Sequence, residues 1–326
     1  MKALVTGGAG FIGSHLVERL LEAGHEVQVV DNLSTGARRN LAHLEEDHRL
    51  QVTVESILDQ AYMDEAIKQA DLVFHLAAAV GVEWVLQHPL GSLETNLRGT
   101  DIVLAAADRH KRPVLIASTS EVYGKNDGGP LREDDDRILG SGQVTRWLYA
   151  TAKAADEALA LAYWQEHQLP TIVLRFFNTI GPRQTGRYGM VVPRLVGQAL
   201  ANEPLTVYGD GKQTRCFTYV RDVVKSVMSL AECGSAWGQV FNIGRDQEIT
   251  IDDLARRIVE LTGSCSAIIH VPYQDAYGPG FEDMRRRVPD VSKLRRCIGY
   301  APDTDLDEAL RQVIASHPAG VAGIAS

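Results

Sequence analysis

The first thirteen residues read Met-Lys-Ala-Leu-Val-Thr-Gly-Gly-Ala-Gly-Phe-Ile-Gly, an apolar run that passes directly into closely spaced glycines. Gly8, Gly10 and Gly13 form the pattern G-x-G-x-x-G, and Gly7 extends it to G-x-x-G-x-x-G. A strand, a glycine turn and a helix in this order admit a pyrophosphate, because no side chain blocks the backbone and the helix N–H groups face the anion. The turn therefore predicts a dinucleotide site.

An acidic residue ends the next apolar run, Val27–Val30. Asp31 lies 18 residues after Gly13, where a carboxylate accepts hydrogen bonds from both hydroxyls of a ribose. The same carboxylate would repel a 2′-phosphate. We therefore expect NAD rather than NADP.

Apolar runs and longer amphipathic segments alternate through the first half of the chain. The runs expected to form strands are Ala3–Val5, Val27–Val30, Leu72–Leu76, Val114–Ala117 and Ile172–Leu174. Helices are expected after Gly13, over Leu93–Ala107 and over Tyr149–His167. This alternation predicts an α/β fold, a Rossmann-type doubly wound parallel sheet with helices on both faces.

After about Arg175 the elements become shorter, and glycine and proline interrupt them. We expect residues 1–175 to form the NAD-binding domain and residues 176–326 a smaller C-terminal α/β substrate-binding lobe. The boundary is soft, because segments after Phe217 can return to the sheet.

Composition excludes several classes of protein. The 326 residues are 45% hydrophobic, and no apolar run approaches the ~20 residues of a membrane helix. The start of the chain reaches glycines too soon for a signal peptide, so a cytoplasmic protein is expected. A net charge of −9 argues against nucleic acid as a partner. The four cysteines are scattered without a C-x-x-C, and this spacing argues against both a disulfide framework and a metal site.

A second group of polar residues follows the run Val114–Ala117. Ser118 and Thr119 come directly after it, while Tyr149 and Lys153 lie four residues apart at the start of a predicted helix and so share a face. Tyrosine, with a pKa near 10, is a weak base at neutral pH. A neighbouring ammonium and an oxidised nicotinamide ring would both lower that pKa. We therefore expect Tyr149 to take a proton from a substrate hydroxyl that Thr119 also binds, while a hydride leaves for NAD.

Over nearly its whole length the chain resembles the extended short-chain dehydrogenase/reductases, in the branch of nucleotide-sugar epimerases, dehydratases and decarboxylases. The segments that carry the resemblance are Thr6–Gly13, Asp31–Gly36, His75–Ala78, Asn96, Thr119, Tyr149 with Lys153, Phe177–Arg183, Leu205–Arg215 and Glu282–Asp290.

The resemblance implies three sets of residues and a homodimer. The implied NAD contacts are Gly7, Gly10, Phe11, Ile12, Gly13, Asp31, Asn32, Leu33, Ser34, Thr35, Gly36, Ser56, Ile57, Leu76, Ala77, Ala78, Asn96, Ser118, Tyr149, Lys153 and Phe176. The implied contacts to a UDP-sugar are Val82, Thr119, Tyr149, Asn178, Arg187, Val191, Pro193, Tyr208, Gln213, Arg215 and Arg287. The implied catalytic residues are Thr119, Ser120, Glu121, Tyr149 and Lys153. Asn178, Arg215 and Arg287 would meet the diphosphate, a role that suits arginine because it donates two parallel hydrogen bonds.

Only part of the charged residues is expected to serve the site. Within the run Arg285–Arg287 we expect one functional arginine and two solvated ones. His75, Asp101 and Glu157 are interpreted as structural or surface groups. The homodimer would pair the predicted helices Leu93–Ala107 and Tyr149–His167, although their apolar residues equally suit the core.

The residues after Thr119 bear on the reaction. All branches oxidise C4 of the sugar, but a 4,6-dehydratase would have an aspartate where this chain has Ser120. Ser120-Glu121 is shared with UDP-glucuronate decarboxylases, whereas Val191–Arg194 and the surroundings of Tyr149 differ from theirs. These differences favour a 4-epimerase.

The substrate is less sharply defined. Arg183 and Arg187 suit the carboxylate of UDP-glucuronate, to be converted to UDP-galacturonate, although either can be a surface arginine. The alternatives are a UDP-glucose 4-epimerase, a UDP-glucuronate decarboxylase and a non-catalytic nucleotide sensor. In an epimerase the hydride returns to the same sugar, so a tightly bound NAD recycled within each turnover is expected.

Overall fold

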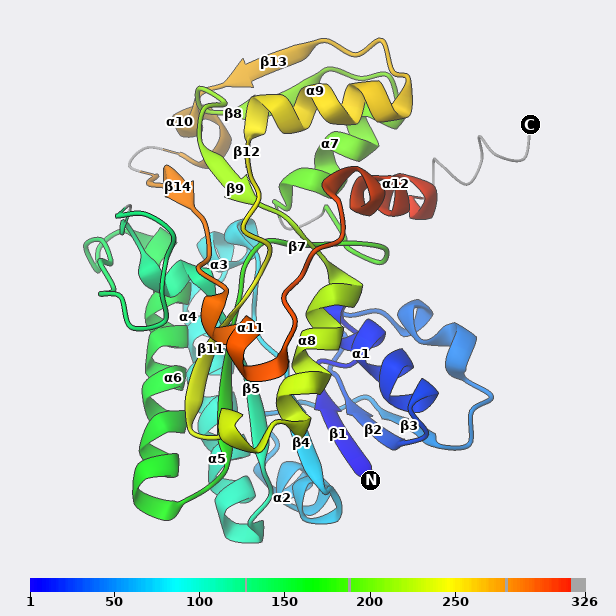
Figure 1. The fold of residues 1–326 in the computed structure, drawn as a ribbon, viewed down its shortest axis with the longest axis vertical. Helices are drawn as coiled ribbons and strands as arrows, with labels where there is room; N and C mark the ends of the chain where they lie inside the picture. The colour runs from blue at the N-terminus through cyan, green and yellow to red at the C-terminus, as the bar shows by residue number, and fades with distance from the viewer. Residues whose placement is uncertain (127, 187–188, 279–280, 318–326) are drawn as a thin grey trace.

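The computed structural model describes residues 1–126, 128–186, 189–278 and 281–317. At its centre lies a seven-stranded sheet in the order β11-β6-β5-β4-β1-β2-β3, with every neighbouring pair parallel (Figure 1). The strands are β1 (Lys2–Thr6), β2 (Glu26–Val30), β3 (Leu50–Thr53), β4 (Leu72–His75), β5 (Val114–Thr119), β6 (Thr171–Phe176) and β11 (Gln239–Ile243). This architecture confirms the predicted Rossmann-type fold.

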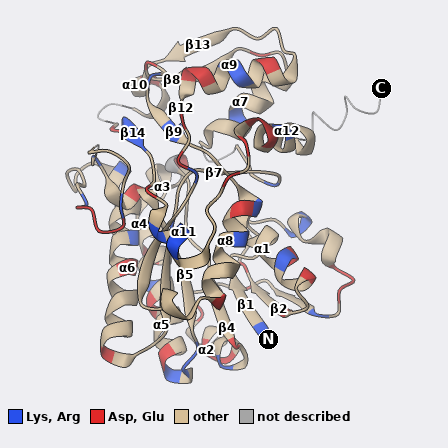
Figure 2. Ribbon diagram, viewed as in Figure 1, with Lys and Arg blue, Asp and Glu red and all other residues tan. Residues whose placement is uncertain are grey.

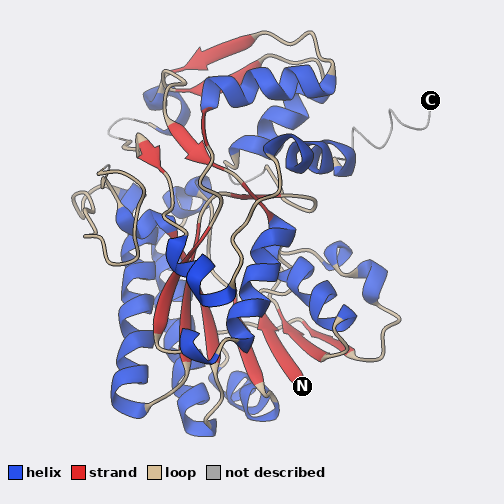
Figure 3. Ribbon diagram, in the orientation of Figure 1, coloured by secondary structure: helices blue, strands red, loops and turns tan. Residues whose placement is uncertain are grey.

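Helices cover both faces of the sheet (Figure 3). One face carries α1 (Phe11–Glu22), α8 (Val220–Glu232) and α11 (Ser292–Ile298), and the other carries α2 (Gln60–Gln69), α5 (Gly99–His110) and α6 (Leu148–His167). Successive residues of β1 enter opposite cores: Val5 packs with α1 and Leu4 with α2, and both are fully buried. Because the central strands are buried on both sides, they read as continuous apolar runs.

Three elements differ from the expected pattern. The helix expected over 93–107 consists of α4 (Pro89–Leu93), a π-helical turn η3 (Glu94–Arg98) and α5. Strand β3 was not predicted because its side chains are half-exposed, with no apolar run. Strand β11 was not predicted because Asn242 interrupts its apolar residues. It adds a seventh strand, beside β6, from beyond residue 175.

A smaller lobe lies over the carboxyl ends of the strands (Figure 1). It contains the pairs β7 (Thr179–Ile180) with β10 (Thr218–Tyr219) and β8 (Leu205–Tyr208) with β13 (Ile268–Val271), and a three-stranded sheet of β12 (Glu248–Thr250), β9 (Thr214–Cys216) and β14 (Arg286–Arg287). Its helices are α7 (Val191–Leu200), α9 (Ile251–Thr262), α10 (Tyr273–Tyr277) and α12 (Leu306–Ser316). The helices α7, α9 and α12 share a hydrophobic core of their own with β8.

Short elements complete the chain: α3 (Val82–Gln87) and the 3-10 turns η1 (Arg38–Asn40), η2 (Ala42–Leu44), η4 (Ser120–Tyr123), η5 (Thr145–Trp147) and η6 (Gly234–Ala236). Acidic and basic side chains are interspersed along the outer helices (Figure 2). Within the described ranges, no helix has the length and apolar character needed to cross a bilayer.

Candidate active site

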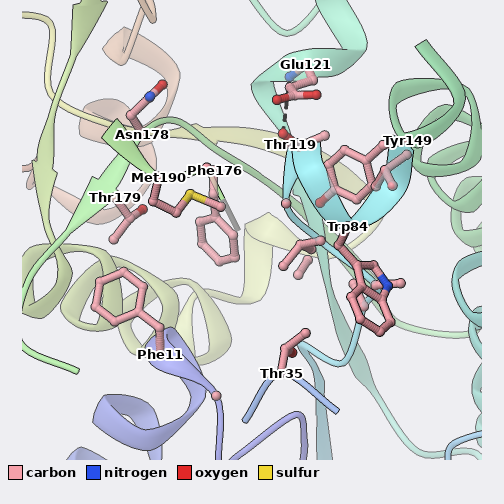
Figure 4. Close-up of a pocket in the computed structure, with 18 of the residues that line it drawn as sticks. Phe11, Thr35, Trp84, Thr119, Glu121, Tyr149, Phe176, Asn178, Thr179 and Met190 are labelled. Carbon is pink, nitrogen blue, oxygen red and sulfur yellow. Dashed lines mark hydrogen bonds between the residues drawn. The ribbon is translucent and has the colours of Figure 1, made fainter. Parts of the chain in front are cut away.

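A cavity of about 690 Å³ lies between the carboxyl ends of the strands and the lobe. Parallel α/β sheets bind ligands at this edge, and the volume suits a ligand of nucleotide size. Figure 4 shows Thr119, Tyr149 and Trp84 along one side of the cavity and Asn178, Thr179 and Met190 along the other. The wall therefore joins the sheet domain and the lobe.

The glycine turn between β1 and α1 forms the floor. Gly7 has a φ of +71°, and a Cβ there would lie 2.7 Å from the backbone nitrogen of Ala77. A Cβ at Gly13 would collide with the carbonyl oxygen of Gly7. Helix α1 starts from Gly10 without a side-chain cap or an acidic residue in its first turn, so its N–H groups remain available for an anion. These residues fit the pyrophosphate of NAD.

Asp31 follows β2 and lines the cavity beside the glycine turn. It is 7% exposed, and its two oxygens accept hydrogen bonds from the backbone N–H groups of Ala9 (3.0 Å) and Leu33 (2.8 Å). Burial raises the pKa of Asp31, and these backbone bonds oppose the rise. A carboxylate has about four lone-pair sites, so capacity remains for a ribose.

Thr119, Tyr149 and Lys153 come together in the cavity wall, as the sequence predicts. Thr119 ends β5, and its hydroxyl accepts the backbone N–H of Glu121 at 3.2 Å. Tyr149 and Lys153 lie one turn apart on α6; Lys153 is fully buried, and its Nζ lies 3.1 Å from Asp156 Oδ2. A proton acceptor and an ammonium thus lie beside the end of β5.

In the protein alone the pKa of Tyr149 lies above its ordinary value, whereas a lower pKa is expected when NAD⁺ is bound. Burial raises the pKa of Tyr149 above its ordinary value, and the charges of Glu121 and Asp156 raise it further, while Arg146 lowers it. Burial is the largest cause, and the Lys153 ammonium beside Tyr149 is paired with Asp156. Tyr149 therefore needs a further positive charge to act as a base, such as an oxidised nicotinamide ring carries.

Glu121 lies between two buried arginines. Arg146 Nη1 is 2.5 Å from Glu121 Oε2, and Arg287 Nη1 is 3.5 Å from Oε1. Burial would raise the pKa of Glu121, but the two guanidinium groups outweigh burial and hold that pKa below its usual range. Glu121 is thus an ionised carboxylate inside the cavity wall.

The same cluster continues toward the lobe. Arg215 Nη2 donates to Asp283 Oδ2 at 2.8 Å, and Arg287 Nη2 donates to Asn178 Oδ1 at 2.6 Å. Three guanidinium groups against the two carboxylates Glu121 and Asp283 leave one net positive charge. Burial and the nearby Arg215 lower the pKa of Arg287 to about 10, so it remains charged at neutral pH. The surplus charge suits an anionic ligand.

Several cavity residues were not predicted from the sequence: Arg146, Arg194, Tyr273, Tyr277 and Asp283. The Arg194 guanidinium lies 3.6 Å above the Tyr208 ring. Buried nitrogens of Arg146, Arg194 and Arg287 have no hydrogen-bond partner among the residues that the structure describes. One signal existed for Arg146, since it lies three residues before Tyr149.

Most of the predicted site residues line this one cavity. They are Gly7, Gly10, Phe11, Ile12, Gly13, Asp31, Asn32, Ser34, Thr35, Ile57, Leu76, Ala77, Ala78, Ser118, Thr119, Ser120, Glu121, Tyr149, Lys153, Phe176, Asn178, Val191, Tyr208, Gln213, Arg215 and Arg287. Of the arginine run, Arg285 pairs with Asp210 and Arg286 with Glu248 at the surface, and Arg287 alone enters the cavity.

Five predicted residues do not line the cavity, and each has another partner. Asn96 accepts the N–H of Ala79 at 2.8 Å and donates to its carbonyl at 3.2 Å, Gly36 packs against the Asp31 carboxylate, and Ser56 accepts the N–H of Leu58. Leu33 packs on the sheet core, and Pro193 is buried in α7. Arg183, expected near the sugar, instead donates to Glu18 of α1 at 2.6 Å. Arg187 and the Val82 side chain lie outside the described part of the chain.

Comparisons with known proteins agree with this geometry. The NAD dependent epimerase/dehydratase family matches residues 3–244. The chain is 43% identical over 314 residues to the UDP-N-acetyl-alpha-D-glucosaminuronate decarboxylase of Bacillus cytotoxicus, covering 96% of each chain. It is 36% identical over 317 residues to UDP-glucuronic acid decarboxylase 1 of Xenopus tropicalis, covering 96% of this chain and 71% of that one.

A solved structure extends the similarity to the fold. The UDP-glucuronic acid 4-epimerase of Bacillus cereus, in complex with UDP-glucuronic acid and NAD, is 31% identical and matches with a TM-score of 0.87 over 97% of this chain and 98% of that one. The glycine turn, the Thr119, Tyr149 and Lys153 group and these matches lead to one conclusion. The chain is an enzyme of the NAD-dependent epimerase/dehydratase family.

Proposed function

We propose that this enzyme decarboxylates a UDP-hexuronate, with UDP-N-acetylglucosaminuronate as the first candidate and UDP-glucuronate as the second. The observation that carries the proposal is the charged group at the sugar end of the cavity, where Glu121 pairs with Arg146 beside Thr119 and Tyr149. Arg146 is near enough to Tyr149 to lower its pKa. The Arg146 guanidinium, though paired with Glu121, places N–H donors beside the residues proposed to bind the C4 hydroxyl, and such donors suit the carboxylate on the adjoining carbon, C5, which a neutral hexose lacks.

The chemistry follows from the position of that carboxylate. Bound NAD⁺ would accept the C4 hydride and later return it to C4. Tyr149 Oη would take the proton of the C4 hydroxyl, which the Thr119 hydroxyl orients. The resulting 4-ketone is β to the C6 carboxylate, so the C5–C6 bond can break with its electron pair delocalised toward the ketone. Carbon dioxide leaves and C5 takes up one proton, which gives a UDP-pentose after C4 is reduced.

The relatives favour this reaction over the 4-epimerase that the sequence suggested. The decarboxylase relative is 43% identical, and the UDP-glucuronic acid 4-epimerase is 31% identical. The sequence disfavours a decarboxylase only because Val191–Arg194 and the surroundings of Tyr149 differ from those of decarboxylases that act on UDP-glucuronate. Those differences are compatible with a decarboxylase whose sugar carries another group at C2. A 4-epimerase remains the alternative reaction because it needs the same oxidation at C4.

One experiment separates the candidates. The purified protein is incubated with UDP-N-acetylglucosaminuronate, UDP-glucuronate and UDP-glucose, each with and without added NAD, and the products are identified by mass and by proton NMR. We expect carbon dioxide and a UDP-pentose from a uronate. A C4 epimer that keeps all its carbon atoms would establish the epimerase instead, and no turnover of any UDP-sugar would favour a nucleotide sensor.

We further propose that NAD stays bound through the cycle and that the enzyme is a homodimer formed through α5 and α6. The hydride returns to the sugar it left, so no step requires NADH to depart. Turnover without added NAD is therefore expected, and accumulation of NADH in proportion to product would contradict it. For the dimer, light scattering should give twice the chain mass, and a monomer at all concentrations would exclude it.

A further inference from the structure

The catalytic lysine has a buried counter-ion on its own helix. Asp156 lies one turn after Lys153 on α6, with 3.1 Å between Lys153 Nζ and Asp156 Oδ2. Both side chains are 1% exposed. The ammonium is therefore shielded from water, and the negative charge of Asp156 offsets part of its electrostatic effect on Tyr149. In a site shielded from water, an ion pair of this kind is felt strongly by its neighbours.

A chain of polar groups supports Asp156 from the sheet. The hydroxyl of Thr100 on α5 faces the carboxylate and lowers the pKa of Asp156, although Oδ1 has no hydrogen-bond partner within the described ranges. His75 of β4 bridges Thr100 Oγ1 (3.2 Å from Nε2) and Thr6 Oγ1 (2.8 Å from Nδ1).

His75 joins Thr6 and Thr100 as a neutral ring. Thr6 Oγ1 accepts the N–H of Ala77, a cavity residue, so its own proton is available for His75 Nδ1. His75 then carries its proton on Nε2 and donates to Thr100, whose proton can point to Asp156. Burial, helped by the charge of Lys153, lowers the pKa of His75 to about 3, so the ring stays neutral. The chain of hydrogen bonds thus runs from Thr6 through His75 to Thr100, whose hydroxyl faces the carboxylate of Asp156.

The charges around Tyr149 come from three elements. Glu121 of η4 and Asp156 of α6 raise the pKa of Tyr149, and Arg146 of η5 lowers it. Burial raises the pKa of Asp156 itself, while Lys153 lowers it and Glu157 raises it. Glu121 is paired with two arginines, whereas Asp156 is paired with the catalytic lysine itself.

We propose that Asp156 is a positioning residue of the active site, which holds the Lys153 ammonium in place and limits how strongly that ammonium favours the ionised form of Tyr149. The proposal rests on the C4 oxidation within the proposed function, a step shared by the decarboxylase and the epimerase. Asp156 therefore sets the pH range in which Tyr149 accepts the substrate proton.

The test replaces Asp156 by Asn, which keeps the shape and removes the charge. Two profiles are measured on the NAD⁺-loaded protein: turnover of an accepted UDP-sugar against pH, and tyrosinate absorbance at 295 nm against pH without a sugar. The Tyr149 contribution to the absorbance is the difference between each protein and the same protein carrying Tyr149→Phe. We expect both midpoints to fall by about one pH unit, because removal of an anion favours the phenolate.

Glu166→Gln is the matched control, since it removes an exposed carboxylate from the same helix and should leave both midpoints in place. Should Asp156→Asn fail to fold, Asp156→Ser replaces it and is judged in the same way. An unchanged midpoint with a lower maximal rate, or a midpoint that rises, would overturn the proposal. If no UDP-sugar is turned over, the proposed function fails, while the absorbance titration still decides the role of Asp156.

Discussion

Two neighbouring arginines of β14 have different surroundings. Arg287 is buried and bonded to Asn178 and Glu121, while its neighbour Arg286 pairs with Glu248 and is one-third exposed. If Arg287 binds the diphosphate as proposed, Arg287→Ala should raise the Kd for UDP by about 10- to 150-fold, because it would remove a charge-assisted contact. Isothermal titration with UDP on the NAD-loaded protein measures this change.

The adjacent arginine provides the control for that experiment. Arg286→Ala removes the same number of atoms one residue away and should change the Kd by less than about twofold, as expected for an exposed pair. Equal losses in the two variants would mean that Arg287 acts through the fold of β14 and not through the ligand.

Residues of the site were predictable where the chemistry is local in sequence. The glycine turn and the Tyr149–Lys153 pair each lie within one turn or one helix, so spacing alone indicates their geometry. The pairing of Glu121 with Arg287, 166 residues later, depends on how β14 meets η4, which no local pattern encodes. The pKa of Tyr149 was also not predictable from local sequence, because burial and the charges of neighbouring side chains set it.

At the scale of elements, the central strands were predictable and the interrupted helix was not. Strands buried on both faces show as apolar runs, whereas the π-helical turn η3 coincides with Asn96 bonding to Ala79. That turn joins α5 to the loop after β4 through one buried amide. Propensity rules describe a helix by itself, so a tertiary contact of this kind is invisible to them.

Two cysteines that lie far apart in the sequence, Cys233 and Cys297, come together where α8 meets α11. Cys233 caps α8, Cys297 lies in α11, and their sulfurs are 3.0 Å apart although 64 residues separate them. Diamide should take two electrons from the two thiols and leave a disulfide. Closing so long a loop can stabilise the fold by about 4 kcal/mol, which corresponds to a rise in Tm on the order of 5 °C.

Mass spectrometry and thermal unfolding check this outcome. Diamide-treated protein should lose two thiols by iodoacetamide labelling and unfold at a higher temperature. Cys233→Ser should lose both effects, while Cys265→Ser, which removes an exposed thiol, should keep both. A Tm unchanged by diamide in protein that has lost the two thiols would show that the bond strains α8 against α11.

At the scale of the whole molecule, two buried histidines make the fold sensitive to acid. His15 of α1 is 5% exposed, and its Nε2 lies 3.0 Å from the carbonyl of Pro182, so the neutral ring donates from Nε2. Burial lowers the pKa of His15 to about 4 and that of His75 to about 3. An unfolded histidine binds its proton near pH 6.5, so below that pH the unfolded chain binds more protons than the folded one.

The free energy of unfolding should therefore fall as the pH falls from about 6.5, by roughly 1.4 kcal/mol per pH unit for each of the two histidines, until the folded rings titrate. His15→Gln retains a donor for Pro182 and removes the titrating ring. Between pH 7 and pH 5 its free energy of unfolding in urea should fall by about 2 kcal/mol less than that of the parent protein. His48→Gln, at an exposed position, should keep the parent slope. Equal slopes for His15→Gln and the parent would show that folding does not lower the pKa of His15.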